Sequence, residues 1–157
     1  MPVTAPEMTR RRLLRACGVA LCAAFGQPGA LLRADEVEDV WNVLTEAASA
    51  LSEGNAKSFL TLFDPSMPDH AMLEANVTAL LNQDQVQSSI ELLSEEGDST
   101  TRMVELDWFL QVVEQQDTAG LARRRERMRC RLAKRGRKWI ITSIEPVAFF
   151  APLRPTR

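Results

Sequence analysis

From Val86 onward, apolar side chains recur at every second position, which is the period of a strand that buries one face. The third such segment is the clearest, because arginines occupy its odd positions while Met128 and Cys130 occupy even ones. Short turns separate the segments, and such turns connect antiparallel strands. The expected strands cover residues 86–95, 100–115, 121–133 and 137–149. Strands this long must twist and bend, so the pattern predicts a strongly curved four-stranded antiparallel sheet.

The alternation also predicts which side chains face the interior of the protein. The expected inner face consists of Val104, Leu106, Trp108, Leu110 and Val112 on the second strand, Met128, Cys130 and Leu132 on the third, and Trp139 and Ile141 on the fourth. We expect Trp108 to lie opposite Cys130, and Cys130 to lie opposite Ile141. A shift of one residue in this pairing would turn the tryptophans toward solvent.

Residues 35–83 show the helical period instead. Asp35 and Asn55 are suited to cap two successive helices, and Gly54 separates them. A third helix is expected to begin after Pro68. Three helices followed by a four-stranded meander predict an α+β domain, with the helices packed on one face of the sheet.

The first 34 residues have the order of an export signal. Arg10–Arg12 and Arg15 form a basic cluster, and the apolar stretch that follows has about ten residues, fewer than the roughly 20 of a membrane-spanning helix. The run Thr-Arg-Arg-Arg-Leu-Leu-Arg resembles the twin-arginine export signal. We expect cleavage after Ala34, with Ala30 as the alternative, and a periplasmic or secreted product without a stable membrane anchor. The expected parts are a signal peptide over 1–34, one domain over 35–151 and a short tail over 152–157.

Composition narrows the classes of function. The leader holds five of the 19 basic residues and one of the 21 acidic ones, which leaves 14 basic and 20 acidic residues and a formal net charge of −6. Nucleic acid is therefore a poor candidate partner. Cys130 is the single cysteine after the leader, and His70 is the single histidine of the chain. We therefore expect no intramolecular disulfide, no metal site and no cofactor.

Two motifs resemble those of a known family. The segment from Gly54 to Pro65 reads Gly-Asn-x-x-x-Phe-x-x-Leu-Phe-Asp-Pro, and the last predicted strand contains Lys138-Trp139-x-Ile141 and ends in Phe149-Phe150. With three helices before a curved sheet, these motifs resemble the nuclear transport factor two-like superfamily, also called SnoaL-like or ketosteroid-isomerase-like. The resemblance covers about residues 36–151 and implies a cone that encloses a pocket. The family includes isomerases, dehydratases, polyketide cyclases and protein-binding modules, so its fold does not determine the function.

In such a cone, inward side chains would line the pocket: Trp41, Phe63, Leu106, Trp108, Leu110, Met128, Cys130, Trp139 and Ile141. Family enzymes pair a carboxylate base with a tyrosine or a protonated acid, but this chain contains no tyrosine. Glu126 and Glu145 are expected as neighbours at the inward rim, where they would share a proton unless Arg124 neutralises them. His70 is a further candidate proton carrier at the pocket mouth. Cys130 is expected to be a small core residue rather than a nucleophile.

The arginines of the third predicted strand are the most distinctive feature of the sequence. Period two places five of them on the outer face: Arg123, Arg125, Arg127, Arg129 and Arg131. They would dock an acidic partner or a second copy of the chain, or they would pair with Glu105 and Asp107 of the preceding strand. The charge of the chain is polarised in the same sense. Residues 35–117 carry 18 acidic and two basic side chains, and residues 118–157 carry two acidic and 12 basic ones.

These features predict an exported protein that binds without catalysis. Its ligand would be a small apolar molecule in the pocket or a protein partner, with a homodimer formed through the outer sheet face. The alternative is an isomerase or dehydratase that uses Glu126, Glu145 or His70. An ionisable group inside a cavity would favour the enzyme, and an exposed arginine row would favour the binding protein.

Overall fold

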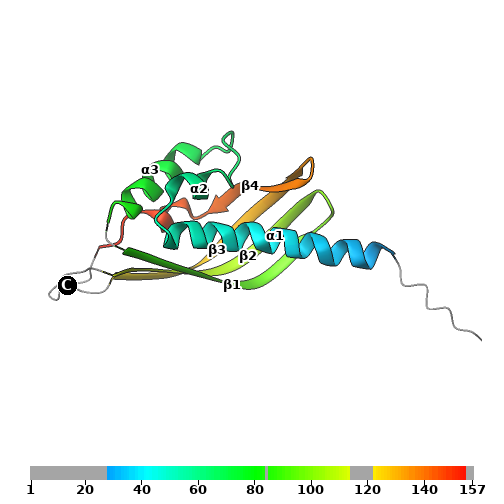
Figure 1. Cartoon of the computed structure of the whole chain (residues 1–157), viewed down its shortest axis with the longest axis horizontal. Helices are drawn as coiled ribbons and strands as arrows, with labels where there is room; N and C mark the ends of the chain where they lie inside the picture. The colour runs from blue at the N-terminus through cyan, green and yellow to red at the C-terminus, as the bar shows by residue number, and fades with distance from the viewer. Residues whose placement is uncertain (1–27, 84, 114–121, 155–157) are drawn as a thin grey trace, which may run out of the picture.

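The computed structural model describes residues 28–83, 85–113 and 122–154. Three helices lie on one face of a four-stranded antiparallel sheet, whose strands follow the chain order β1-β2-β3-β4 (Figure 1). The elements are α1 (Pro28–Ser52), α2 (Ala56–Leu60), α3 (His70–Leu81), β1 (Gln85–Gly97), β2 (Thr101–Val113), β3 (Ala122–Arg135), β4 (Lys138–Glu145) and the 3₁₀ helix η1 (Val147–Phe150). The predicted α+β class, with three helices before an antiparallel meander, is confirmed.

Local sequence signals explain most of the helix ends. Asn55 caps α2, because its side-chain oxygen accepts a hydrogen bond from the backbone N–H of Ser58 at 2.9 Å. Gly54 follows α1 with a positive φ of 69°, which glycine adopts without strain. The predicted start of the first helix at Asp35 is wrong, because α1 already begins at Pro28. Proline suits the first turn of a helix, where its missing N–H would be unpaired in any case.

The export signal falls largely outside the part of the chain that the structure describes. Residues 1–27 are not described, so export, and the twin-arginine route in particular, stay predictions. Both expected cleavage positions, after Ala30 and after Ala34, lie within α1. Among the described helices, none combines the length and the apolar character that crossing a membrane requires.

The sheet has its predicted inner face, although its register differs from the expected one. Trp108 lies opposite Glu126 and Cys130 lies opposite Val104, so the pairing of β2 with β3 is displaced by four residues from the prediction. An even displacement keeps every side chain on its predicted face. Trp108 is fully buried and Trp139 is 5% exposed. The alternation in the sequence defines the face of each residue, but the partner depends on the turn between the strands.

A bulge in the pairing of β3 with β4 changes the alternation along β4. Ile141 pairs with Leu132, but Ile144, three residues later, pairs with Cys130 and is also buried. The expected pairing of Cys130 with Ile141 is therefore wrong. One extra residue in a strand moves the following side chains to the opposite face, so Glu145 points outward.

β4 ends at Glu145, whereas the sequence predicted a strand that continues to residue 149. Pro146 follows, and a proline has no backbone N–H to donate to a neighbouring strand. Phe149 and Phe150 lie instead in η1, which packs against α3. Both rings are buried there.

Aromatic rings fill the space between the sheet and the helices. The ring centroid of Trp108 lies 5.2 Å from that of Phe150 and 6.1 Å from that of Phe149. The rings of Phe59 and Phe63 lie 4.8 Å apart. None of these five side chains is more than 2% exposed. The middle of the cone is therefore packed with side chains.

The segment between α2 and α3 extends the sheet beyond β4. Phe63 forms a parallel bridge with Ile141. The backbone N–H of Asp64 donates to the carbonyl oxygen of Ile141 at 2.8 Å. The N–H of Ile141 donates to the carbonyl oxygen of Leu62 at 2.9 Å. Residues 62–64 thereby cover the outer edge of β4 and tie the helical layer to the sheet.

Candidate functional site

The predicted pocket-lining residues lie in one continuous hydrophobic core. Seven of the nine are at most 2% exposed: Phe63, Leu106, Trp108, Leu110, Met128, Cys130 and Ile141. Trp139 is 5% exposed and Trp41 is half-buried. Phe63 and Trp139 also border clefts that open to the surface.

One of these clefts, here called the α2–α3 cleft, lies between α2 and α3 and has a volume of about 600 Å³. His70, the first residue of α3, borders it and is half-buried. Glu74 follows one turn later on the same side of the helix. The walls are otherwise largely apolar, and their apolar members are Ala56, Leu60, Phe63, Pro65 and Ile140. His70 therefore lies beside a space of ligand size, although this space is outside the cone.

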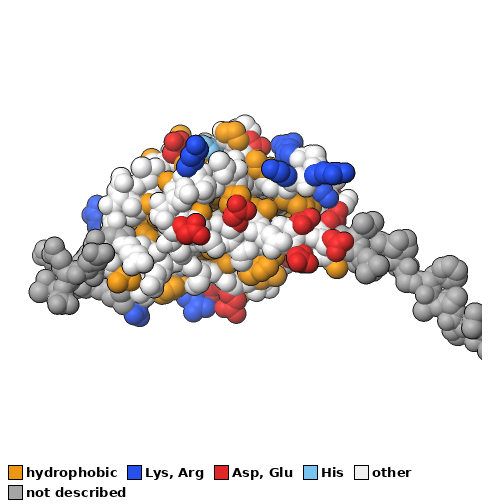
Figure 2. All heavy atoms as spheres, viewed as in Figure 1, with side chains coloured by type: hydrophobic (Ala, Val, Ile, Leu, Met, Phe, Trp, Pro, Cys, Tyr) orange, Lys and Arg blue, Asp and Glu red, His pale blue; other side chains and the backbone are white. Residues whose placement is uncertain are grey.

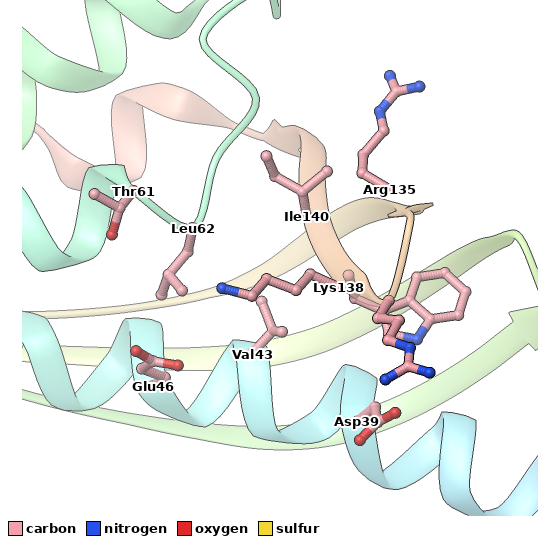
Figure 3. Close-up of a pocket in the computed structure, with 10 residues that line it drawn as sticks. Asp39, Val43, Glu46, Thr61, Leu62, Arg135, Lys138 and Ile140 are labelled. Atoms are coloured by element: carbon pink, nitrogen blue, oxygen red, sulfur yellow. The ribbon is translucent and has the colours of Figure 1, made fainter.

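A second cleft, here called the α1–β4 cleft, has a volume of about 590 Å³ (Figure 3). On one side, α1 contributes Asp39, Val43 and Glu46, which recur at helical spacing and therefore share a face. On the other side, the turn from β3 into β4 contributes Arg137 and Lys138. The side chain of Lys138 extends across the cleft above Val43 (Figure 3). This cleft is thus bordered by charges of both signs.

The structure does not bring Glu126 and Glu145 together. Glu145 lies opposite Arg129 on the outer face, whereas Glu126 lies opposite Trp108 on the strand face that points inward. Both carboxylates are exposed: Glu145 because it points outward, and Glu126 because β4 ends before it reaches that level of β3. The expectation that they are neighbours at the inward rim is wrong, and the bulge in β3–β4 pairing is its cause.

Arg124 has a different role from the expected neutralisation of these carboxylates. Its guanidinium Nη1 donates hydrogen bonds to the backbone carbonyl oxygens of Phe149 and Ala151, the second at 2.9 Å. Within the described residues, it forms no ion pair with Glu126 or Glu145. Arg124 therefore holds the segment after β4 against β3.

Cys130 lacks the setting of a nucleophile. Its side chain is fully buried, and this burial raises the pKa of the thiol to about 12. The thiol is thus protonated at neutral pH and acts as a small apolar residue. Over the described residues, no group of three or more histidine, cysteine, aspartate or glutamate side chains is placed to hold a metal ion.

The five arginines of β3 are all exposed, and we call them the arginine row: Arg123, Arg125, Arg127, Arg129 and Arg131. Arg125 Nη2 lies 2.7 Å from Asp107 Oδ2. Arg129 Nη2 lies 3.2 Å from Glu105 Oε1. The hydrogen bond from Arg125 lowers the pKa of Asp107. The members without an ion-pair partner within 4 Å among the described residues are Arg123, Arg127 and Arg131. Cross-strand pairing therefore neutralises only part of the row.

A buried ionic cluster that was not predicted from the sequence lies near the β1–β2 turn. Arg102 is 5% exposed, with Nη2 at 3.5 Å from Glu36 Oε2 and Nη1 at 3.7 Å from Glu95 Oε1. Lys134 Nζ lies 3.3 Å from Glu36 Oε1. Burial raises the pKa of Glu95, and the positive charge of Arg102 offsets part of this effect. A signal was present, because Arg102 and Val104 both occupy even positions of β2 and share its inner face.

Comparison with known proteins supports the fold. No protein-family model matches the sequence, and no curated protein matches it. Among solved structures, a protein of unknown function from Mycobacterium tuberculosis matches with a TM-score of 0.62 and 13% identity over 83% of this chain and 76% of that chain. A scytalone dehydratase-like protein from Novosphingobium aromaticivorans gives a TM-score of 0.64 and 9% identity over 82% of this chain and 89% of that one.

A nuclear transport factor two-like superfamily protein from Salmonella enterica gives a TM-score of 0.58 and 12% identity over 80% of this chain and 94% of that one. Identities this low show a shared fold and carry no information on activity. The chain therefore has the cone-shaped α+β fold of the nuclear transport factor two-like proteins.

Proposed function

We propose that this chain is an exported, non-catalytic binding protein that takes a small apolar molecule in the α2–α3 cleft. The observation that carries the proposal is the character of this cleft, about 600 Å³ in volume with five apolar side chains in its walls. Ligand pockets commonly have volumes of about 300–1,000 Å³, with apolar walls and a few placed polar groups. His70, Glu74 and Lys57 supply such polar groups here.

The placement of Glu126 and Glu145 favours binding over catalysis, and His70, which borders the α2–α3 cleft, is the group that the enzyme alternative retains. Proton transfer at carbon needs a base that is held within hydrogen-bond reach of a bound substrate and shielded from water. Glu126 and Glu145 are exposed on opposite faces of the sheet. The aromatic rings of the core occupy the middle of the cone, so neither carboxylate faces a cavity there. The dehydratase-like neighbour supports the fold only, and an isomerase or dehydratase stays the alternative.

A change of one leucine tests the proposed ligand site. Leu60→Glu places a carboxylate in the apolar wall, and we expect it to weaken binding of the neutral dye Nile red about tenfold, because an apolar ligand does not compensate for the desolvation of the charge. Leu93→Glu is the matched control, since Leu93 is 43% exposed on β1, away from the cleft. Dye fluorescence measures affinity, and circular dichroism verifies that both variants fold. Equal dye affinity of the two variants would refute this site.

The arginine row supports a second candidate function, association of two copies through the outer sheet face. On this face Glu91 and Glu96 of β1 are exposed, and Phe109 of β2 lies between β1 and β3. A two-fold axis that runs parallel to β2, between two sheets that face each other, would place the basic β3 of one copy over the acidic β1 of the other. Such a contact is self-complementary, as an isologous dimer interface requires.

Charge reversal on the row tests this second candidate. We expect the wild-type chain to sediment as a dimer in analytical ultracentrifugation and the Arg127→Glu, Arg131→Glu double variant to sediment as a monomer, because like charges then face the partner's acidic strand. Lys57→Glu with Arg154→Glu changes the net charge equally at exposed positions elsewhere and should leave the dimer intact. A monomeric wild-type chain, or a dimer that survives the arginine changes, would reject association through this face. If both double variants sedimented as monomers, association through this face would also be rejected, because the loss of the dimer would then follow from net charge alone.

A further inference from the structure

Two walls of opposite charge face each other across the α1–β4 cleft. Asp39 and Glu46 lie on α1, and Arg137 and Lys138 lie where β3 turns into β4. Figure 2 shows the same division on the surface, with acidic side chains along α1 and basic side chains gathered over the end of β3 and β4. All four side chains are exposed. Within the described residues, no ion pair of 4 Å or less connects the two walls.

The charges of the cleft are balanced, which limits the class of ligand. Arg135 also borders the cleft, but its Nη2 lies 3.4 Å from Asp64 Oδ2 and is paired there. The remaining charged side chains of the cleft are two acidic and two basic ones. A simple anion or a simple cation would therefore meet attraction at one wall and repulsion at the other. A molecule that carries both charges satisfies both walls.

The floor of the cleft is apolar, and a buried tryptophan with an unpaired N–H borders it. Val43, Leu62 and Ile140 line it with half-buried aliphatic side chains. Trp139 borders the same cleft and is 5% exposed, and its indole Nε1 has no hydrogen-bond partner among the described residues. A buried indole N–H normally donates a hydrogen bond. Nε1 is itself shielded from solvent, so Trp139 contributes a buried, unpaired donor to the wall of the cleft, a feature independent of the charges.

We propose that the α1–β4 cleft binds a small zwitterion with an apolar body, the class to which the free apolar amino acids belong. In this arrangement the ammonium group faces Asp39 and Glu46, and the carboxylate faces Arg137 and Lys138. The apolar body covers the aliphatic floor. The two clefts share Thr61 and Ile140 in their walls, but the inference does not rest on the proposed function, because the α2–α3 cleft carries neither of the two opposed walls.

The test follows the indole N–H signals of the full chain by ¹⁵N nuclear magnetic resonance. The chain has three tryptophans, and the variant Trp139→Phe identifies the Trp139 signal. L-leucine should shift this signal with a dissociation constant of about 1 mM, because exposed ion pairs contribute little each. N-acetyl-L-leucine lacks the ammonium group and L-leucinamide lacks the carboxylate, so each should bind about fivefold more weakly. The Trp108 indole, which donates to Ser88 Oγ at 2.8 Å, serves as the internal reference and should not move.

Matched variants separate the two walls. Glu46→Gln should weaken leucine binding about fivefold. It should also weaken the binding of leucinamide more than the binding of N-acetyl-leucine, because leucinamide carries only the ammonium group and depends on the acidic wall alone. Lys138→Gln should give the reverse preference. Glu53→Gln and Arg154→Gln change exposed side chains outside both clefts and should leave leucine affinity unchanged. The proposal is overturned if leucine leaves the Trp139 signal in place or if the capped probes bind as tightly as leucine. Nile red binding in the α2–α3 cleft is measured separately and does not depend on this result.

Discussion

Replacing Trp108 by alanine should lower the free energy of unfolding by about 4 kcal/mol, the largest effect that we expect from a single apolar change in this chain. The side chain is fully buried, and its ring meets those of Phe149 and Phe150 from η1. Its indole N–H also donates to Ser88 Oγ at 2.8 Å. The variant removes these contacts together and leaves a cavity between the sheet and η1. Urea denaturation followed by circular dichroism measures the loss.

Two further variants show which part of the Trp108 environment matters. Ser88→Ala removes the acceptor and leaves the indole N–H unpaired, which should cost about 1–2 kcal/mol. Trp41→Ala removes a half-buried indole from α1 and should also cost about 1–2 kcal/mol, less than the change at Trp108. If all three variants had the same small effect, the aromatic cluster would not be the centre of the core.

Replacing Arg102 by alanine should destabilise the protein by about 3 kcal/mol at pH 7. The change leaves Glu36 and Glu95 without this partner, and their side chains are 15% and 9% exposed. An uncompensated carboxylate in this setting is unfavourable because it has lost most of its hydration. Arg131→Ala is the matched control, since Arg131 is exposed on the same sheet and should change stability by no more than about 0.5 kcal/mol. Thermal and urea unfolding of both variants provide the comparison.

The effect of Arg102→Ala should depend on pH in a defined direction. Burial holds the pKa of Glu95 above its ordinary value in the folded protein, and removal of Arg102 takes away the attraction that lowers it. A carboxyl group whose pKa is raised by folding binds its proton more tightly in the folded state, so its unfavourable contribution is complete above the folded pKa and disappears below the unfolded one. The variant should therefore lose less stability at pH 4 than at pH 7. Glu95→Gln in the same background should restore part of the loss at pH 7, and a pH-independent loss would contradict this account.

The two-residue alternation in the sequence was sufficient to predict the faces of the sheet but not its pairing. Trp108, Cys130 and the arginine row all lie on the faces that their even or odd positions predict. The register of β2 with β3 depends on the connecting turn, so a displacement of four residues left no trace in the apolar pattern. Glu145 was assigned to the wrong face because a bulge shifts the pattern by one residue, and the sequence contains no glycine there to indicate it.

The clefts at the surface could not be predicted from the sequence, because no local pattern shows which distant residues meet there. Asp39 and Lys138 are almost one hundred residues apart, and they border one cleft because residues 62–64 and β4 bring the helical layer against the sheet. Arg102 is a different case, because its even position in β2 already predicted burial. A charged side chain on the predicted inner face requires a buried partner of opposite charge. That requirement would have directed attention to the acidic residues of α1 and β1.

The backbone bridge between Phe63 and Ile141 has a consequence for how this sheet resists aggregation. An uncovered edge strand offers free N–H and C=O groups to which another chain can add as a further strand. Residues 62–64 occupy the β4 side, so, within the described sheet, β1 is the other edge, and there only Ser88 has its backbone N–H and C=O paired with the Ser52 hydroxyl of α1 among the hydrogen bonds of the described residues. There the irregular pairing between Leu92 and Ser94 and the acidic side chains of Glu91 and Glu96 oppose an incoming strand. Loss of the bridge would therefore expose a second edge strand as a template for fibril growth.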